Sequence, residues 1–489
     1  MNLDEYRAHD ATGLAQLVAD KAVTAAELLA LAQQRAAEVN PRLNAIVRDV
    51  PADPDRARTG PFGGAPFLIK DLSQDYAGVP TSAGSRAFMS LPATEHATVV
   101  QRWIDAGLVI FGKTNTPEFG AKGITEPDAW GPTRNPWDLQ RSPGGSSGGA
   151  AAAVAAGIVP CAGASDGGGS IRIPAASCGL VGLKPGRGLI PSGPATGESM
   201  HGAAVQGVVS RTVRDTAGML DVLAGGEPCA PFSPAVPATS FAAAVGRDPG
   251  RLRIGVRVPT AINPAPDREA FAAVETAVRV LTELGHHVEE LPRAPFDDAA
   301  LARDFLLTWF VYTAWELAEA KRVTGAGDDA FERDTLILAG LGRATSSVDY
   351  LDAVQRRHEH TRKLSTYFES FDLLLTPTLA TPPPRIGEFD LPVALQRGAD
   401  VLLKTRTAGL LRYTKIVDDM VDKNLSWVPY TQLANLTGRP AISLPLHWTA
   451  DNLPLGVQFV APLDGEALLI RLAAQLETAL PWHDRVPPI

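Results

Sequence analysis

The sequence predicts an α/β fold in which a mixed, mostly parallel β-sheet is covered by α-helices on both faces. Two observations support this prediction. Short apolar runs at 66–70 and 108–111 have the length of buried strands, and a segment with helical periodicity lies between them at 96–106. Alternation of strands and helices is typical of sheets with helices on both faces. Because no internal repeat and no clear linker interrupts the chain, we expect a single domain over 1–489.

The individual elements follow from the same patterns, taken in chain order. Thr24 and Glu27 have the spacing of a capping box at the start of a helix. The segment 226–250 is rich in proline and alanine, and we expect it to be a surface connection. Apolar runs predict strands at 66–70, 108–111, 158–162, 252–258, 287–291, 371–375, 441–446 and 454–460. Helical periodicity predicts helices at 12–20, 24–38, 96–106, 149–157, 171–178, 267–284, 300–322, 347–370 and 465–479.

Composition narrows the partners and the compartment. The 489 residues carry a net charge of −9 and no basic cluster, which argues against a nucleic-acid partner. Three cysteines are too few for a disulfide framework and favour a reducing compartment. The N-terminus is acidic, and the longest uncharged apolar run, 150–164, is shorter than the roughly 20 residues that span a bilayer. We therefore expect a cytoplasmic protein without a membrane partner, whose oligomeric state stays open.

The segment 142–174 has an unusual concentration of small residues. Two serine loops, 144–149 and 167–170, lie on either side of an alanine-rich run. Glycines at this density allow backbone to approach a neighbour closely or to adopt dihedral angles that side chains forbid. A serine among such glycines is a candidate nucleophile that faces free backbone N–H groups.

Two familiar motifs occur in the sequence without the context that they need. Residues 107–114 match the phosphate-binding pattern G-x-x-x-x-G-K-[ST], but Leu-Val-Ile-Phe at its centre predicts a buried strand instead of an exposed loop. The pattern G-x-S-x-G occurs around Ser146 and again around Ser147, as in α/β-hydrolases. That motif requires a preceding strand and a later histidine with a recognisable setting, and 135–143 makes a poor strand. We expect neither nucleotide binding nor an α/β-hydrolase site, and no Cys/His spacing suggests a metal.

The segments PFLIKDL, GKTNTPEFG, TRNPWDLQRSPGGSSGG, SDGGGSIRIPAASCGLVGLKPGRG, LLTPT and ANLTGRPAISLP together resemble the amidase signature family of serine hydrolases. The resemblance covers nearly the whole chain. Within the family, the sequence looks most similar to the bacterial branch that contains cyclic nylon-dimer hydrolases and urethanase-like enzymes. It implies a catalytic core over 65–220. The region that departs most from the family pattern, 296–430, is expected to be helical and to shape the substrate pocket.

The resemblance implies roles for individual residues. Ser170 would be the nucleophile that forms an acyl-enzyme, and Ser146, after a cis peptide bond, would relay its proton to Lys70. Because a lysine acts as a base only when neutral, burial would have to lower the pKa of Lys70 from its usual 10.4. Backbone N–H groups of Gly167, Gly168, Gly169 and Ser170 would form the oxyanion hole, without a cofactor or a metal. Where relatives often carry threonine, this chain has Gly167, so the loop is expected to be looser.

Further residues are expected to support this site. Ser147, Ser165, Asp166 and Arg172 would hold the serine loops in shape. The aromatic stripe of Phe305, Trp309 and Tyr312 has helical spacing, which is typical of core packing but would also suit a pocket wall. With Gly120, these three residues are the candidate substrate pocket.

The resemblance therefore implies an amidohydrolase that cleaves carbon–nitrogen bonds other than peptide bonds in a small-molecule amide or carbamate. Linear and cyclic amides, anilides, urethanes and esters all remain open as substrates. The alternative is an amidase-like subunit of an amidotransferase, which would act only with its partners.

Overall fold

The computed structural model describes residues 1–55, 59–232, 234–390, 396, 398, 400, 402–403 and 424–489. Its strands are β1 (Ile46–Asp49), β2 (Pro66–Lys70), β3 (Val109–Thr114), β4 (Cys161–Asp166), β5 (Val181–Lys184), β6 (Val205–Ser210), β7 (Arg253–Val256), β8 (His287–Glu290), β9 (Leu373–Pro377), β10 (Ala441–Trp448) and β11 (Pro454–Val460). Its helices are α1 (Leu3–Ala8), α2 (Ala11–Ala19), α3 (Ala25–Leu43), α4 (Thr98–Asp105), α5 (Gly148–Ala155), α6 (Arg172–Cys178), α7 (Val213–Leu223), α8 (Arg268–Glu283), α9 (Asp298–Thr324), α10 (Arg333–Ala344), α11 (Ser347–Tyr367), α14 (Gln432–Thr437) and α15 (Glu466–Ala479).

These strands form one mixed sheet in the order β1-β3-β2-β4-β6-β5-β10-β11-β9-β7-β8. The α/β class and the mixed sheet are confirmed, but the expectation that the sheet is mostly parallel is wrong. Parallel pairs occur on its two sides, β3-β2-β4 and β9-β7-β8, whereas the middle of the sheet from β4 to β9 is antiparallel. The reason is that β10 and β11 form a hairpin, which must be antiparallel. In addition, β5 and β6 were not predicted from the sequence, and they pair antiparallel with each other and with their outer neighbours.

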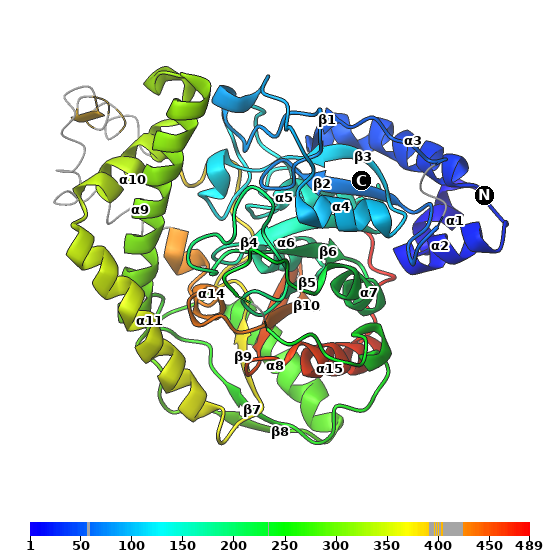
Figure 1. The fold of residues 1–489 in the computed structure, drawn as a ribbon. Coiled ribbons are helices and arrows are strands. Elements are labelled where there is room, and N and C mark those ends of the chain that lie inside the picture. The colour runs from blue at the N-terminus through cyan, green and yellow to red at the C-terminus, as the bar shows by residue number, and fades with distance from the viewer. Residues whose placement is uncertain are drawn as a thin grey trace.

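Helices cover the sheet in two groups, which Figure 1 shows around the central strands. α5 and α6 contact each other and pack on the inner strands, while α7, α15 and α8 form a second connected group on the opposite face. α5 is buried from Gly148 to Val154. A Cβ at Gly149 would come within 2.3 Å of the Asn115 backbone nitrogen, so the small residues of α5 are what allows it to lie against the strands.

The predicted helices and strands are all present, with shifted ends. The capping box of Thr24 and Glu27 forms at the start of α3. The segment 226–250, apart from residue 233, which lies outside the described residues, connects α7 to β7. The sequence missed α1, β1, β5, β6, α7, α10 and α14, most of which are too short to display a helical or alternating pattern.

The segment that resembles a phosphate-binding loop is β3 itself. All six residues of β3 are buried. The Lys113 amine donates a hydrogen bond to the Thr81 hydroxyl and lies 4.0 Å from the Asp71 carboxylate. Because this backbone pairs with β1 and β2, its N–H groups cannot wrap a phosphate. The expectation of no phosphate loop here is confirmed.

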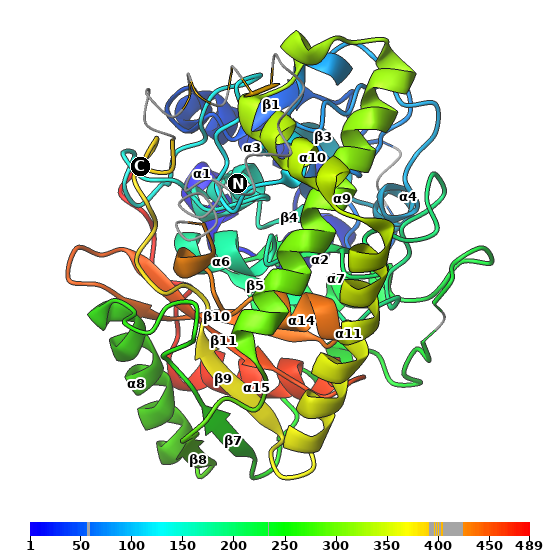
Figure 2. The same cartoon turned by 90° about the vertical axis from the view of Figure 1, so that its left-hand side faces the viewer.

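Three helices, α9, α10 and α11, run along one side of the molecule, where Figure 2 shows them in front of the sheet. Asp297 caps the start of α9, and Gly325, with φ of 70°, ends it. The variable region expected at 296–430 includes these helices, but its residues 391–395, 397, 399, 401 and 404–423 lie outside the described residues. Within the described ranges, none of the helices combines the length and the apolar character that crossing a membrane requires.

Two parallel strands bring the candidate residues to one edge of the sheet. β2 and β4 are neighbours and run in the same direction, so their carboxyl ends lie side by side. Lys70 is the last residue of β2, and Ser165 and Asp166 are the last residues of β4. The loop that carries Ser170 follows directly, before α6 begins.

Candidate active site

Lys70 lies at the centre of the site. Its amine is 2.7 Å from the Ser146 hydroxyl oxygen and 3.0 Å from the Ser165 hydroxyl oxygen. The backbone N–H of Lys70 donates to the Gln74 side chain at 2.6 Å, which fixes the end of the strand. The structure therefore joins Lys70 to Ser146, two of the residues that the sequence singled out, across 76 positions of the chain.

The surroundings of Lys70 favour the neutral amine. The side chain is fully buried, and its burial lowers the pKa of the amine from 10.5 to about 7, against an opposing effect of the Asp166 carboxylate. Taking an ammonium group out of water disfavours its charged form, because the interior cannot replace its hydration. Burial thus favours a neutral amine at position 70 near pH 7, and a neutral amine can accept a proton from the hydroxyl beside it.

Ser146 lies in the first serine loop, directly before α5. The Gly145–Ser146 peptide bond is cis, as the resemblance implied. Its neighbour Ser147 bonds to the backbone of Ser165, with the hydroxyl 3.3 Å from both the carbonyl oxygen and the nitrogen. This bond ties the first serine loop to β4. No strand precedes the loop, so the geometry differs from the nucleophile turn of α/β-hydrolases.

Ser170 lies in the second loop and lines a cavity. Its side chain is nearly buried and forms no hydrogen bond to any residue that the structure describes. The N–H groups of Gly167, Gly168 and Ser170 likewise donate to no described residue. Gly168 and Ser170 line the cavity, so two of these backbone donors lie at its wall beside the serine hydroxyl, whereas Gly167 is not part of the lining.

Gly169 differs from the expectation that it would serve as a fourth oxyanion donor. Its N–H donates to the Asp166 carboxylate at 2.7 Å and is therefore already engaged. Gly169 has another role, because its φ of 134° lies in a region that side chains rarely adopt, and a Cβ there would come within 2.5 Å of the Thr431 hydroxyl. This glycine shapes the turn.

A buried ion pair holds the second loop, as expected for Asp166 and Arg172. The guanidinium of Arg172 donates two hydrogen bonds to the Asp166 carboxylate, both at 2.9 Å. Burial alone would raise the pKa of Asp166, but the charge and the hydrogen bonds of Arg172 hold it down at about 2. The carboxylate also accepts the N–H of Ile171 at 3.2 Å. Asp166 thus stays ionised and fixes the loop at two backbone positions.

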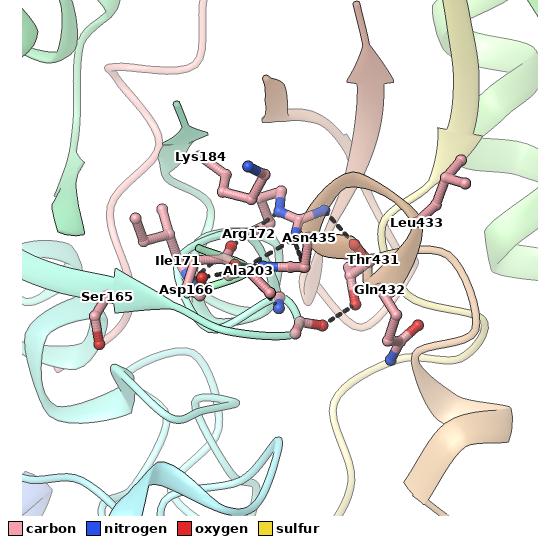
Figure 3. A network of polar contacts seen from close by, with 12 residues as sticks. Ser165, Asp166, Ile171, Arg172, Lys184, Ala203, Thr431, Gln432, Leu433 and Asn435 are labelled. Carbon is pink, nitrogen blue, oxygen red and sulfur yellow. Dashed lines mark hydrogen bonds and ion pairs between the residues drawn. The ribbon is translucent and has the colours of Figure 1, made fainter. Parts of the chain in front are cut away.

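The sequence did not indicate that the C-terminal part of the chain completes this network, which Figure 3 shows. The side-chain amide of Asn435 donates to the Asp166 carboxylate at 2.8 Å, and its oxygen accepts from Arg172 at 2.7 Å. The Thr431 hydroxyl donates to the carbonyl oxygen of Gly168 at 2.5 Å, and Gln458 accepts from Arg172 at 2.6 Å. The segment ANLTGRP, which contains Asn435, was a signal for that residue, but it includes neither Thr431 nor Gln458.

A cavity of about 110 Å³ is lined by Ser170 and Gly168. Of the four pocket residues predicted, Gly120, Phe305 and Trp309 line it. Tyr312 does not, because its place on α9 lies beyond the cavity, where its hydroxyl is 2.8 Å from that of Ser199. The described lining is mostly apolar, and it includes residues that the sequence did not indicate: Lys122, Ile124, Ile173, Asp334, Leu338, Phe389, Leu425, Val428 and Gln432.

Two aromatic rings of α9 lie directly over the second loop. A Cβ at Gly168 would come within 2.7 Å of the Phe305 ring, whereas one at Gly167 would meet the Trp309 ring at 3.4 Å, an ordinary contact. Phe305 and Trp309 are themselves in contact, with their ring centroids 5.2 Å apart. The aromatic stripe therefore both walls the cavity and limits the space above the loop.

This difference in space gives a matched pair of variants. We expect Gly168→Ala to lower kcat/KM for a hydrolysed amide by about 100-fold, the effect of misplacing one backbone donor, because the loop must move away from Phe305. Gly167→Ala should stay within a few-fold of the parent protein. The double variant Gly168→Ala with Phe305→Ala should recover at least part of the loss. Equal losses in the two single variants would contradict this assignment.

The comparisons with known proteins show which family the chain belongs to. Residues 27–470 match the family model described as Amidase. A 6-aminohexanoate-cyclic-dimer hydrolase of Pseudomonas sp. (strain NK87) is 37% identical over 493 residues, covering 98% of this chain and 96% of the relative. The solved structure of a 6-aminohexanoate cyclic dimer hydrolase complexed with substrate is 36% identical, with a TM-score of 0.87 and 99% of each chain covered.

A second solved structure, of a bacterial aryl acylamidase belonging to the amidase signature enzymes, is 27% identical, with a TM-score of 0.82 and coverage of 97% of this chain and 98% of that one. Both the family model and these relatives span nearly the whole chain, including both serine loops and Lys70. The chain therefore belongs to the amidase signature family of amidohydrolases.

Proposed function

We propose that this protein hydrolyses small-molecule amides through an acyl-enzyme formed on Ser170, with Ser146 as proton relay and Lys70 as base. The observation that carries the proposal is the contact of 2.7 Å between the Lys70 amine and the Ser146 hydroxyl, within a site that lowers the pKa of the amine to about 7. A serine hydroxyl is a weak nucleophile on its own, and a neighbouring base that is neutral near pH 7 activates it.

The proposed reaction moves one proton along this path and back. Ser170 attacks the carbonyl carbon and passes its proton to Ser146, which passes its own to Lys70. When the tetrahedral intermediate collapses, the proton returns through Ser146 to the departing amine nitrogen, and the carbon–nitrogen bond breaks. Water then repeats the sequence in place of Ser170, releases the acid and restores the serine.

The N–H groups of Gly167, Gly168 and Ser170 are proposed to stabilise the oxyanion that forms at each attack. One such donor contributes about 3–4 kcal/mol to lowering a barrier of this kind, because it is already in place when the charge develops. The fixed Asp166–Arg172 pair supports the proposal, since it holds the loop that presents these donors. The proposed route uses protein groups alone and needs no cofactor.

The substrate class is proposed from the cavity and from the relatives. A mostly apolar cavity of about 110 Å³ suits a compact substrate with aliphatic or aromatic carbon around the amide. Cyclic amides are the first choice, because two of the relatives are named for a cyclic dimer of 6-aminohexanoate. Aryl amides are the second. Linear amides, urethanes and esters react through the same intermediate and belong in the same panel.

Dependence on pH tests the role of Lys70. Because only the neutral amine accepts a proton, we expect kcat/KM to fall about tenfold per pH unit below pH 7 and to level off above it. The measurement is kcat/KM from pH 5 to 9.5, with circular dichroism at each pH as the control for folding. A profile that is flat between pH 5 and 7 in the folded protein would contradict this role.

The alternative of an amidotransferase subunit is tested by the purified chain alone. We propose that it turns over an amide without ATP and without a second protein. Strict dependence on a partner would favour the alternative.

A reducing, cytoplasmic setting also stays a proposal, supported by the absence of any disulfide at Cys161, Cys178 and Cys229, all of which are free.

A further inference from the structure

The wall of the substrate cavity contains an ion pair that the proposed reaction does not use. Lys122, in the loop that follows Glu118–Gly120, and Asp334, in the first turn of α10, both line the cavity. The Lys122 amine lies 2.6 Å from the Asp334 carboxylate and 3.4 Å from the Glu332 carboxylate. Most of the described lining around this pair is apolar, so it is a distinctive polar feature of the cavity.

The ammonium group of Lys122 is held in its charged form. Burial would lower its pKa, but the two carboxylates more than offset that effect and raise the pKa above its ordinary value. Glu332 is itself fixed, because its carboxylate accepts the N–H of Asp128 at 2.9 Å and its own N–H donates to Glu118 at 2.8 Å. Asp334 is the more accessible partner, with 28% of its side chain exposed.

A ligand that carries a carboxylate therefore meets a cation that is already paired. To reach Lys122, the ligand would have to displace the Asp334 carboxylate from the ammonium group. It would then lie near the carboxylates of both Asp334 and Glu332 and would also lose its own hydration. A further carboxylate, Asp390, also lines the cavity and adds to the repulsion. A neutral group faces no such cost, and a cationic group can pair with Asp334.

We propose, on the basis of the amidase function proposed above, that the Lys122–Asp334 pair determines substrate charge, so that this site accepts neutral or cationic amides and rejects anionic ones. The two residues act by electrostatics on the distal part of the substrate and take no part in the proton path. Their variants should accordingly change the ratio of kcat/KM between substrates of different charge and leave the catalytic pH dependence in place.

The two members of the pair should change this preference in opposite directions. Asp334→Asn removes one of the two negative charges that pair with Lys122, so a substrate carboxylate can pair with the ammonium group instead. Lys122→Gln leaves Asp334 and Glu332 without their cation, so a substrate ammonium group gains. Asp328→Asn is the matched control, because it removes the same charge from an exposed pair with Lys321 that does not line the cavity.

The experiment compares kcat/KM for three para-nitroanilides with acyl chains of equal length: hexanoyl (neutral), glutaryl (one free carboxylate) and δ-aminovaleryl (cationic). A second set places the charge on the leaving group, as the para-methyl and para-carboxylate acetanilides. Released amine is quantified by chromatography. In at least one set we expect the parent protein to prefer the neutral over the anionic substrate by at least tenfold.

Asp334→Asn should reduce that preference by about tenfold, and Lys122→Gln should raise the cationic-to-neutral ratio several-fold, while Asp328→Asn changes neither. Because each result is a ratio within one variant, partial loss of folded protein does not affect it. If neutral anilides are hydrolysed but the ratios are near one in both sets, or do not respond to either variant, this inference is wrong and the proposed amidase function stands. If no neutral amide is hydrolysed at all, the proposed function fails and this inference fails with it.

Discussion

Replacing Ser170 by alanine is expected to lower kcat/KM by about 10⁴-fold or more, the scale of loss when a nucleophile is removed from a hydrolase triad. The physical reason is that Ser170 is proposed to form the covalent bond to the substrate, and no neighbouring group replaces it. Its side chain is nearly buried at the cavity wall, so alanine removes the hydroxyl without leaving a large void. Substrate binding and stability should therefore change little.

Ser199→Ala is the matched control for this variant. It removes the same hydroxyl group from a serine that bonds Tyr312 outside the cavity, and it should retain near-parental activity. Both variants are compared by kcat/KM and by their midpoint of thermal unfolding. A folded Ser170→Ala protein with more than about one hundredth of the parental activity would refute the assignment of the nucleophile, since the proposed triad cannot work without it.

Replacing Lys70 by methionine is expected to abolish activity to a comparable degree while increasing stability at low pH. Methionine fills a similar volume but accepts no proton, so the path from Ser170 through Ser146 has no end point. The stability effect follows from the lowered pKa of the buried amine, because folding must remove a proton that the unfolded chain retains.

The sign of this effect depends on pH. The pKa of Lys70 is about 7 in the folded protein and near 10.5 in the unfolded chain. The cost of burying the amine is therefore absent above about pH 10.5, grows as the pH falls, and is complete below pH 7. Between pH 9 and pH 6, the stability of Lys70→Met relative to the parent should rise by about 3 kcal/mol, from 1.36 kcal/mol per pKa unit.

Denaturant unfolding of both proteins at pH 6 and pH 9 measures this difference. Lys113 and Lys184 are also buried with lowered pKa values of about 8 and about 7, but they are present in both proteins and their contributions cancel. A stability difference that is the same at the two pH values would mean that Lys70 is not held neutral. Residual activity near the parental level would mean that it is not the base.

The fold was predictable where a continuous apolar run decides it, as at β2, or where a long periodic segment does, as at α9. It was not predictable in the middle of the sheet. There β5 is a short strand with Gly182 in its interior, and its place is decided by pairing with β10, more than 250 residues later in the chain. Such pairings depend on tertiary contact and carry no local pattern.

The site shows the same division. Lys70, Ser146 and Ser170 have local signatures, namely a strand end and two glycine-rich loops. Asn435 lies in the resembling segment ANLTGRP, but that segment does not indicate its role, because the role exists only when α14 lies against the second loop. Lys122 and Asp334 face each other across more than 200 residues, and nothing near either of them suggests a pair.

Two expectations failed for identifiable reasons. A run of glycines before a serine suggested four free backbone donors, but the Asp166 carboxylate lies within reach of the loop and takes the N–H of Gly169. Helical spacing placed Tyr312 on the same face as Trp309, but spacing does not indicate where the cavity ends. In both cases a neighbour that is distant in sequence, or the shape of the molecule, decided the outcome.

The central claim is that Ser170 carries the acyl group while Lys70 draws its proton, and the residue modified by a fluorophosphonate tests it most directly. Trypsin releases both loop serines in one peptide, from Ser142 to Arg172, so fragment-ion mass spectrometry is needed to distinguish them. We expect the adduct on Ser170, forming more slowly below pH 7 and at least 100-fold more slowly in Lys70→Met. An adduct on Ser146, or labelling of Lys70→Met at the parental rate, would contradict the proposed mechanism.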